Sequence, residues 1–228
     1  MGNGNSLEKK GSGIRAVVLD YGEVLCERPK KDALQRMAQV IGIEPHRFFE
    51  LYGTSRDPYD QGVIGAYEYW KDFANRAGTS IDPSVVKRLR SLDTEMWSST
   101  SPEMMEWVDR LNESELTTAV LSNMQHDMAA YARKNFPWFA HLDYQILPCE
   151  VGLIKPDPAI FHETVRRVGV RPEEALFVDD KESNVKAARG TGMVAIRFQS
   201  PKQLRGELQQ MGFEVLPRET GASESACG

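Results

Sequence analysis

The sequence predicts an α/β protein with a Rossmann-like parallel sheet, flanked by helices and interrupted after its first strand by a helical insert. Three observations predict this class. Short apolar segments rich in valine alternate with amphipathic segments after Pro102, which is the pattern of β-α units on a parallel sheet. Residues 28–98 show helical periodicity and no strand pattern. The length of 228 residues, with 41% hydrophobic and 27% charged residues, suffices to bury a sizeable core.

The first strand is expected over residues 14–19, an apolar run that only Arg15 interrupts. It ends at Asp20-Tyr21-Gly22, which suits a buried strand that continues into a loop. In the insert, apolar residues recur at helical spacing, and glycines and Asp-Pro pairs separate the segments. The insert is therefore expected to contain helices at 32–41, 45–52, 66–77 and 83–96.

Strands and helices alternate in the rest of the chain. Helices are expected at 103–111, 125–135, 158–169 and 183–190, and strands at 116–121, 144–147, 175–178 and 194–198. Ligands of an open parallel sheet bind at the carboxyl ends of its strands, so functional residues are expected just after the strands. Residues 1–13 and 217–228 are small, polar and aperiodic, and are expected to be flexible termini.

Composition and charge exclude several classes of protein. The net charge is -5 and the isoelectric point is near 5.5, which disfavours nucleic acid or an anionic membrane as a partner. No membrane span or signal peptide is indicated, so a cytoplasmic location is expected. The cysteines Cys26, Cys149 and Cys227 lack metal-site spacing and are expected to be free thiols. A small molecule is the expected partner, and the protein is expected to be a monomer or a homodimer.

Four polar clusters occur at or near the ends of predicted strands. Asp20 ends the first strand, Ser122 and Asn123 end the second, Lys155 precedes a proline before the next helix, and Asp179-Asp180 follow a buried strand. Taken singly, each cluster has an ordinary structural interpretation as a turn former, a helix cap or a solvated charge. Those interpretations do not predict the joint occurrence of all four at one edge of a parallel sheet, which favours a shared site.

This site would hold an anionic nucleophile, hydrogen-bond donors, a cation and paired carboxylates. Adjacent carboxylates repel each other unless a cation lies nearby, and such hard oxygen ligands suit Mg²⁺. Phosphoryl transfer requires positioning of the phosphate and neutralisation of its oxygens. The residues therefore favour a Mg²⁺-dependent hydrolase of phosphate esters with Asp20 as its nucleophile.

The order and spacing of these clusters resemble the four motifs of the haloacid dehalogenase (HAD) superfamily over about residues 14–200. The segments 152–161 (GLIKPDPAIF) and 177–188 (FVDDKESNVKAA) are similar to the branch with the soluble epoxide hydrolase phosphatase domain and bacterial glucose-1-phosphate phosphatases. The resemblance implies a phosphatase that acts on a small phosphorylated metabolite, for example a sugar phosphate, through an aspartyl-phosphate. It further implies a discontinuous HAD-like core, residues 14–27 and 99–216, with residues 28–98 as a helical cap.

The resemblance also implies a role for each site residue. Asp20 would attack phosphorus and bind Mg²⁺, together with the backbone carbonyl of Gly22 and the carboxylate of Asp180. The other implied roles are metal support by Asp179, phosphoryl binding by Ser122 and Asn123, phosphate neutralisation by Lys155 and orientation of the metal's surroundings by Asn184.

One position departs from the family's phosphatases. Gly22 stands where they usually carry a second Asp, the general acid and base, although the Asp-x-Gly-x-Val-Leu form resembles bacterial sugar phosphatases of the same branch. General acid-base catalysis contributes about 10²–10⁴-fold, so a slow phosphatase is compatible with the sequence. Glu23 is the nearest alternative acid, but strand alternation would turn it away from Asp20 unless the loop bends.

Two other functions stay open. The protein could be a catalytically weak or non-catalytic binding protein, for which Gly22 is the main support. It could also be a 2-haloacid dehalogenase, in which the same Asp displaces halide without a second Asp. Dehalogenases, however, need no metal and lack paired carboxylates such as Asp179-Asp180. They also carry a Tyr two residues after the nucleophile, whereas Tyr21 follows Asp20 directly.

Overall fold

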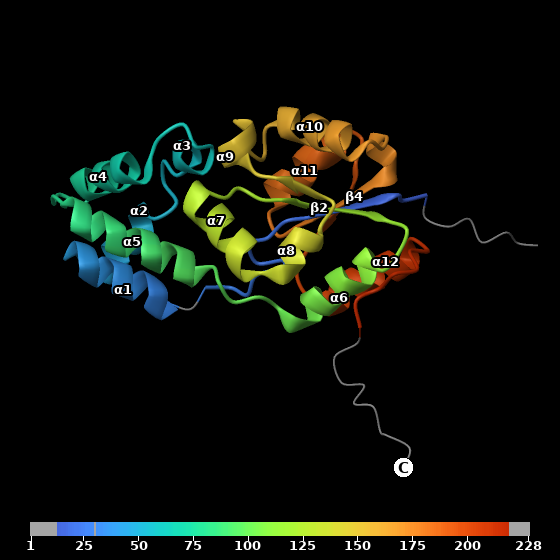
Figure 1. Cartoon of the computed structure of the whole chain (residues 1–228), viewed down its shortest axis with the longest axis horizontal. Helices are drawn as coiled ribbons and strands as arrows, with labels where there is room; N and C mark the ends of the chain where they lie inside the picture. Colours follow the sequence, from blue (N-terminus) through green and yellow to red (C-terminus); the bar gives the residue numbers. More distant parts are fainter. Residues whose placement is uncertain (1–12, 30, 219–228) are drawn as a thin grey trace, which may run out of the picture.

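The computed structural model describes residues 13–29 and 31–218. Five parallel strands form one sheet in the order β3-β2-β1-β4-β5, with helices on both faces (Figure 1). The strands are β1 (Ala16–Leu19), β2 (Thr117–Leu121), β3 (Tyr144–Ile146), β4 (Ala175–Asp179) and β5 (Val194–Arg197). The predicted fold class, an α/β protein with a Rossmann-like parallel sheet flanked by helices, is confirmed.

Seven helices of the described chain flank the sheet. They are α6 (Pro102–Asn112), α7 (His126–Asn135), α8 (Pro137–His141), α9 (Pro148–Val151), α10 (Pro158–Val168), α11 (Glu182–Gly190) and α12 (Pro201–Gln210). The sequence patterns predict α6, α7, α10 and α11, but not α8, α9 or α12. The helices α8 and α9 have only five and four residues, too few for periodicity to be visible. The helix α12 is largely polar and buries only Leu204 and Leu208.

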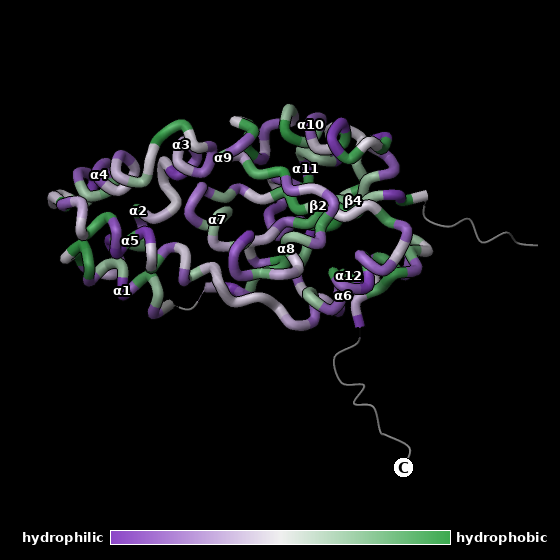
Figure 2. The backbone as a smooth tube through the Cα atoms, in the orientation of Figure 1, coloured by the Kyte–Doolittle hydropathy of each residue, from purple (hydrophilic) through white to green (hydrophobic). Residues whose placement is uncertain are grey.

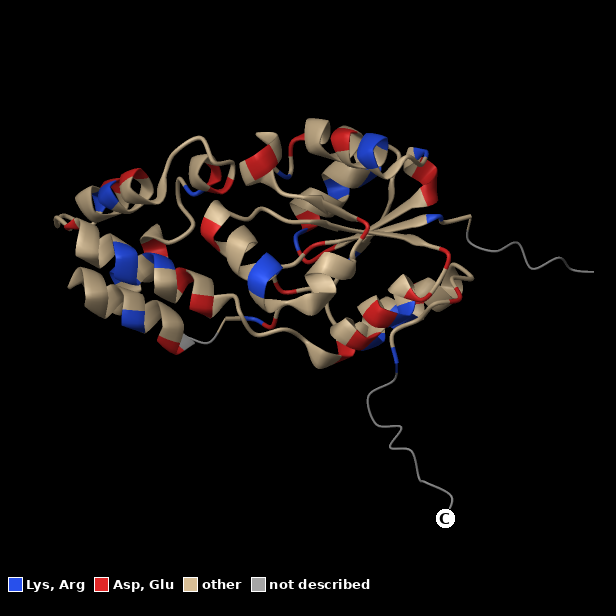
Figure 3. Ribbon diagram, viewed as in Figure 1, with Lys and Arg blue, Asp and Glu red and all other residues tan. Residues whose placement is uncertain are grey.

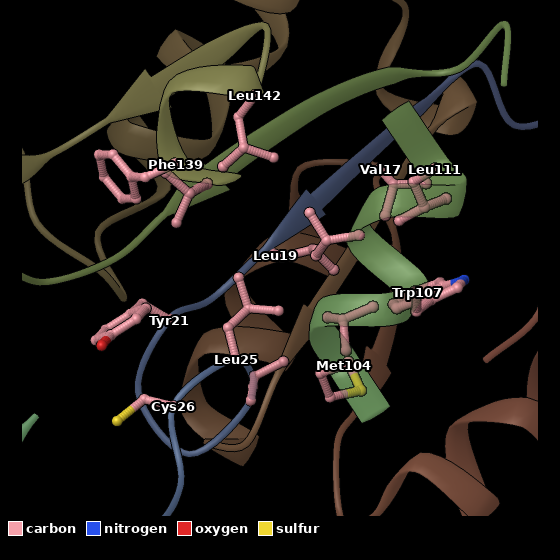
Figure 4. Packing of buried hydrophobic residues seen from close by; sticks show 14 of the residues in the cluster. Val17, Leu19, Tyr21, Leu25, Cys26, Met104, Trp107, Leu111, Phe139 and Leu142 are labelled. Atoms are coloured by element: carbon pink, nitrogen blue, oxygen red, sulfur yellow. The ribbon is translucent and has the colours of Figure 1, made fainter. Parts of the chain in front are cut away.

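The alternation of side chains along β1 divides the core into two hydrophobic clusters. Val17 and Leu19 pack on one face against α6, α7, α8 and α12, and Figure 4 shows them beside Trp107 and Leu111 of α6. Ala16 and Val18 pack on the other face with residues of α10 and α11. Because both faces are covered, all four residues of β1 are apolar. Figure 2 shows hydrophobic segments along the strands in the middle of the core.

The first five helices after β1 form the helical insert, which we define as residues 31–96 (Figure 1, left). They are α1 (Lys31–Ile41), α2 (Pro45–Leu51), α3 (Asp57–Asp60), α4 (Ala66–Arg76) and α5 (Pro83–Met96). The four helices predicted here are present, and the four-residue helix α3 is additional. The insert has its own hydrophobic cluster, in which Phe48, Trp70 and Phe73 are fully buried.

Two hydrogen-bonded segments connect the insert to the sheet. The amide of Glu27 donates to the carbonyl of Ser99 at 2.8 Å, and the amide of Ser101 donates to the carbonyl of Leu25 at 2.9 Å. The expected boundaries between core and insert, after residues 27 and 98, fall in these segments. None of the described helices is long and apolar enough to cross a lipid bilayer.

The structure tests only part of what the sequence predicts for the cysteines and the two termini. Cys26 and Cys149 are free thiols, and both are buried. Cys227 lies outside the described residues, as do 1–12 and 219–228, which make up most of the two termini that were expected to be flexible.

Candidate active site

The carboxyl ends of β1, β2 and β4 bring the predicted site residues together. These strands are neighbours in the sheet, and the amide of Asp20 donates to the carbonyl of Val178 at 2.9 Å, which aligns the loop after β1 with the end of β4. One cavity of about 260 Å³ is bordered by nearly all of the predicted residues: Asp20, Gly22, Glu23, Ser122, Asn123, Lys155, Asp180 and Asn184. Asp179 is fully buried next to this cavity wall.

Lys155 lies at the centre of the charged groups. Its Nζ atom is 2.9 Å from Oδ1 of Asp20 and 2.6 Å from Oδ2 of Asp179, and it donates to the carbonyl of Leu121 at 2.8 Å. The three protons of the ammonium group therefore have three acceptors. Burial lowers the pKa of Lys155, but the two carboxylates raise it, and the net pKa lies above its ordinary value. Lys155 is thus a fixed cation beside Asp20.

The two oxygens of the Asp20 carboxylate have different surroundings. Oδ1 accepts from the amide of Tyr21 at 2.7 Å and lies next to Lys155. Within the described residues, Oδ2 accepts no hydrogen bond, so it is the oxygen that is free to attack or to bind a metal. Burial raises the pKa of Asp20 to about 6, opposed by Lys155 and reinforced by Asp179. A cation at Oδ2 would favour the ionised, nucleophilic form.

Three carboxylates could surround a metal ion. One oxygen atom each of Asp20, Asp179 and Asp180 lie within 4.8 Å of one another. The pKa of Asp180 is raised by burial and then by the charge of Asp179, which is the penalty that a divalent cation would relieve. Within the described chain, no backbone amide donates to the carbonyl of Gly22, which borders the same cavity. This set of hard oxygen atoms fits Mg²⁺.

Asp179 differs from the other two carboxylates because both of its oxygens are occupied. Oδ1 accepts from the amide of Lys181 at 2.8 Å, Oδ2 lies 2.6 Å from Lys155, and the Nδ2 atom of Asn184 lies 3.0 Å from each oxygen. Asn184 therefore orients Asp179, which in turn positions Lys155. The free oxygens that remain for a metal belong to Asp20, Asp180 and the Gly22 carbonyl.

The side chain of Asn123 binds the backbone of Lys155, a contact that the sequence does not predict. Its Nδ2 atom donates to the carbonyl of Lys155 at 2.9 Å, and its Oδ1 atom accepts from the amide of Lys155 at 3.0 Å. One N–H of Nδ2 is therefore engaged with the backbone, while no described residue accepts from the other N–H, which stays available to a ligand in the cavity that Asn123 borders. Ser122, which also borders the cavity, is a second side-chain donor of this loop.

The loop after β1 bends, which is the condition under which the sequence allows Glu23 to face Asp20. Glu23 has a φ of 55°, in the left-handed region, and its side chain borders the cavity next to the exposed Arg28, whose Nε atom is 2.9 Å from its Oε2. A carboxylate near the nucleophile is therefore available despite Gly22. A Cβ atom at Gly22 would lie 3.6 Å from the ring of Trp97, an ordinary contact, so a Cβ atom fits at this position.

Residues of the insert form part of the cavity wall, and the sequence does not predict which ones. They are Tyr52, Gly53, Arg56, Asp57 and Asp60, and Trp97 of the connecting segment lies beside them on the cavity. These residues come from α3 and the turn before it. No spacing pattern marks them, because only the folding of the insert onto the sheet brings them to the cavity.

The family assignment follows from this fold and site together with a family comparison. The model of the haloacid dehalogenase-like hydrolases matches residues 14–192. The chain therefore belongs to the haloacid dehalogenase-like hydrolase family, as the resemblance of the motifs implied.

The relatives that the chain matches carry the names of different enzymes. Mouse acyl-CoA dehydrogenase family member 10 is 29% identical over 221 residues, which are 90% of this chain and 20% of that protein. Flavin mononucleotide hydrolase 1 of Arabidopsis thaliana is 32% identical over 100 residues, 39% of this chain and 41% of that protein. (S)-2-haloacid dehalogenase 1 of Pseudomonas sp. is 27% identical over 195 residues, 81% of this chain and 84% of that protein. The chain thus spans less than half the length of the first two relatives.

Solved structures share the fold. The HAD family enzyme bt-2542 of Bacteroides thetaiotaomicron, in complex with magnesium and inorganic phosphate, has a TM-score of 0.68 and 20% sequence identity. The match covers 82% of this chain and 94% of that chain. At this level of identity the likeness shows a common fold.

Proposed function

We propose that the protein is a Mg²⁺-dependent phosphatase that hydrolyses a small phosphorylated metabolite through an aspartyl-phosphate on Asp20. The observation that carries the proposal is the charge arrangement around Lys155, whose buried ammonium lies 2.9 Å from Asp20 and 2.6 Å from Asp179. A nucleophilic carboxylate and a phosphate repel each other, and this cation opposes the repulsion. The flavin mononucleotide hydrolase among the relatives supports the same class of reaction.

Each residue of the site has a separate role in the proposed reaction. One carboxylate oxygen of Asp20 attacks phosphorus, and the bond between phosphorus and the leaving oxygen breaks, while the other carboxylate oxygen would hold the metal. Oδ1 stays hydrogen-bonded to the amide of Tyr21, which keeps the carboxylate in one orientation. Lys155 and the hydroxyl of Ser122 stabilise the phosphoryl oxygens, and a bound Mg²⁺ would neutralise further charge there. Water then attacks phosphorus in the aspartyl-phosphate, which releases phosphate and restores Asp20.

Protonation of the leaving oxygen falls to Glu23 in this proposal. It is the carboxylate of the β1 loop that borders the cavity beside Asp20 and Asp180, and it replaces the acid missing at Gly22. The carboxylate of Glu23 is held by Arg28, whose Nε atom lies 2.9 Å from Oε2, and must leave this ion pair to reach the leaving oxygen. We therefore expect slow turnover of substrates with poor leaving groups. A catalytically weak or non-catalytic binding protein is the alternative.

A 2-haloacid dehalogenase is the second candidate, favoured by the dehalogenase relative that matches 81% of the chain. The cluster of Asp20, Asp179 and Asp180 opposes it, since three carboxylates within 4.8 Å serve a metal-dependent reaction better than a metal-free one. Release of halide from 2-chloropropionate without added metal would support this candidate.

Hydrolysis of p-nitrophenyl phosphate tests the proposed function. Its leaving group needs little protonation, so the assay depends on the nucleophile and the metal and hardly on Glu23. We expect activity with Mg²⁺ that EDTA removes and that Asp20→Asn lacks. Equal rates for wild type and Asp20→Asn at every Mg²⁺ concentration would contradict the proposal.

We further propose that the helical insert acts as a cap that selects the substrate. The contribution of Tyr52, Arg56, Asp57 and Asp60 to the cavity supports this role. The cytoplasmic location, the small-molecule partner and the choice between monomer and homodimer stay predictions from the sequence.

A further inference from the structure

The insert gives the cavity an acidic wall. The charged residues that it contributes are two carboxylates, Asp57 and Asp60, and one guanidinium, Arg56. A third carboxylate, that of Asp93 on α5, is fully buried with its Oδ2 atom 2.9 Å from Nη2 of Arg56. Figure 3 shows acidic residues on α3 and α5 where the insert approaches the core. Two carboxylates and one guanidinium of the insert therefore line this side of the cavity, and the carboxylate of Asp93 is buried against that guanidinium.

Arg56 is already neutralised and is not available to bind an anionic ligand. Its Nη2 and Nη1 atoms lie 2.9 and 3.3 Å from the two oxygens of Asp93, and its Nε atom lies 3.2 and 3.3 Å from those of Asp60. Only 14% of the Arg56 side chain is exposed. Its guanidinium carbon lies 5.2, 5.5 and 5.7 Å from the ring centroids of Tyr52, Tyr59 and Tyr69. Such a cage holds the guanidinium inside the insert.

Asp57 is the free acceptor on this wall. It lies in the first turn of α3, is exposed and borders the cavity. Within the described part of the chain, its carboxylate accepts no hydrogen bond and forms no ion pair. A hydroxyl or ammonium group on a ligand can donate to it, whereas a second carboxylate or phosphate would be repelled.

The opposite charge is concentrated at the nucleophile. Lys155 and Lys181 border the cavity there, and a metal ion on Asp20 and Asp180 would add to them. The cavity therefore has a cationic end for a phosphate and an acidic side for the rest of the molecule.

We propose that the substrate is a phosphate monoester of an alcohol that carries hydroxyl or amino groups and no second anionic group. This inference rests on the proposed phosphatase function. The acidic wall accepts hydrogen bonds from the leaving alcohol through Asp57 and disfavours phosphorylated acids, bisphosphates and haloacids. The carboxylate of a 2-haloacid has no free cation of the insert to bind.

Matched pairs of substrates test the charge preference. Glycerol phosphate and 3-phosphoglycerate differ in a hydroxymethyl against a carboxylate, and phosphoethanolamine and phosphoglycolate differ in a protonated aminomethyl group against a carboxylate. We expect the first member of each pair to have a kcat/KM at least about tenfold higher at low salt. The ratio should decrease as salt is added, because ions screen charges that border an open cavity.

A charge reversal at Asp57 tests whether the substrate preference comes from charge or from the shape of the cavity. Asp57→Lys should lower the preference about tenfold, because it places a cation where the leaving group lies. The matched control is Asp72→Lys on α4, which makes the same change of charge at an exposed residue paired with Arg76. Asp72 does not border the cavity, so the control should keep the preference within about twofold.

The outcomes distinguish the inference from the function on which it rests. Hydrolysis of p-nitrophenyl phosphate combined with a preference for 3-phosphoglycerate or phosphoglycolate would overturn the inference and leave the phosphatase function intact. A preference that Asp57→Lys and Asp72→Lys change equally would also overturn it. Failure to hydrolyse p-nitrophenyl phosphate would overturn the proposed function itself.

Discussion

The side chain of Asn123 binds both backbone polar groups of Lys155. Its Nδ2 atom donates to the Lys155 carbonyl at 2.9 Å, and its Oδ1 atom accepts from the Lys155 amide at 3.0 Å. This contact joins the loop after β2 to the segment that precedes α10. It fixes the backbone from which the Lys155 side chain reaches Asp20 and Asp179, so Asn123 is a positioning residue.

Removal of this contact should slow the reaction without removing any reacting group. We expect Asn123→Ala to lower kcat for p-nitrophenyl phosphate by about 10–10²-fold, because an ammonium displaced by about 1 Å stabilises the transition state poorly. KM should change less than kcat. Asn135→Ala is the control, since Asn135 also donates to a carbonyl, that of Tyr131 at 2.9 Å, but on the surface of α7. Equal kcat values for both variants would refute the positioning role.

Loss of the nucleophile should make the metal-free protein more stable. Burial raises the pKa of Asp20 from 3.8 to about 6, which means that folding disfavours its ionised form. Asp20→Asn removes that cost, and Lys155 keeps its ion pair with Asp179 at 2.6 Å. We expect no measurable phosphatase activity and an increase of about 1–3 kcal/mol in the free energy of unfolding at pH 7. Urea denaturation in EDTA measures this, and a large destabilisation would contradict the assigned electrostatics.

A proton donor introduced at position 22 should accelerate the enzyme. A Cβ atom at Gly22 would lie 3.6 Å from Trp97, an ordinary contact, and the φ of Gly22 is not in the left-handed region. We expect Gly22→Asp to raise kcat by about 10–10²-fold for alkyl phosphates and far less for p-nitrophenyl phosphate. Gly22→Asn, which has the same shape but no acid, should not accelerate either substrate. If both variants accelerate the reaction, the increase in kcat comes from packing and not from a proton donor.

Glu23 should matter only where the leaving group needs a proton. We expect Glu23→Gln to lower kcat for alkyl phosphates by about tenfold and to leave p-nitrophenyl phosphate nearly unchanged. Glu27→Gln is a suitable control, because Glu27 belongs to the same loop but does not border the cavity. If Glu23→Gln slows both substrates equally, its carboxylate acts on the metal or the loop and not on the leaving group.

The sequence predicts the sheet side of the site better than the insert side. Asp20, Ser122 and Asp180 each follow a strand, and parallel strands bring such residues to one edge whatever the details of packing. The role of Asn123 and the bend at Glu23 depend on single hydrogen bonds and one φ value, which composition and spacing do not encode. The buried pair of Arg56 and Asp93 requires α3 to pack on α5, and a four-residue helix has no periodicity to predict.

The acidic wall should also leave a signature in the pH dependence of stability. Burial raises the pKa of Asp60 from 3.8 to about 6, against the opposing charge of Arg56. Between these two pH values the folded protein holds a proton that the unfolded chain has lost, so the contribution of Asp60 to stability is full below pH 3.8 and is lost as the pH rises through 6. Asp60→Asn lacks this titration. The free energy of unfolding of wild type relative to Asp60→Asn should therefore fall by about 1–3 kcal/mol between pH 4 and pH 7, measured by urea denaturation in EDTA. A difference that stays constant or rises over this range would show that Asp60 is ionised throughout.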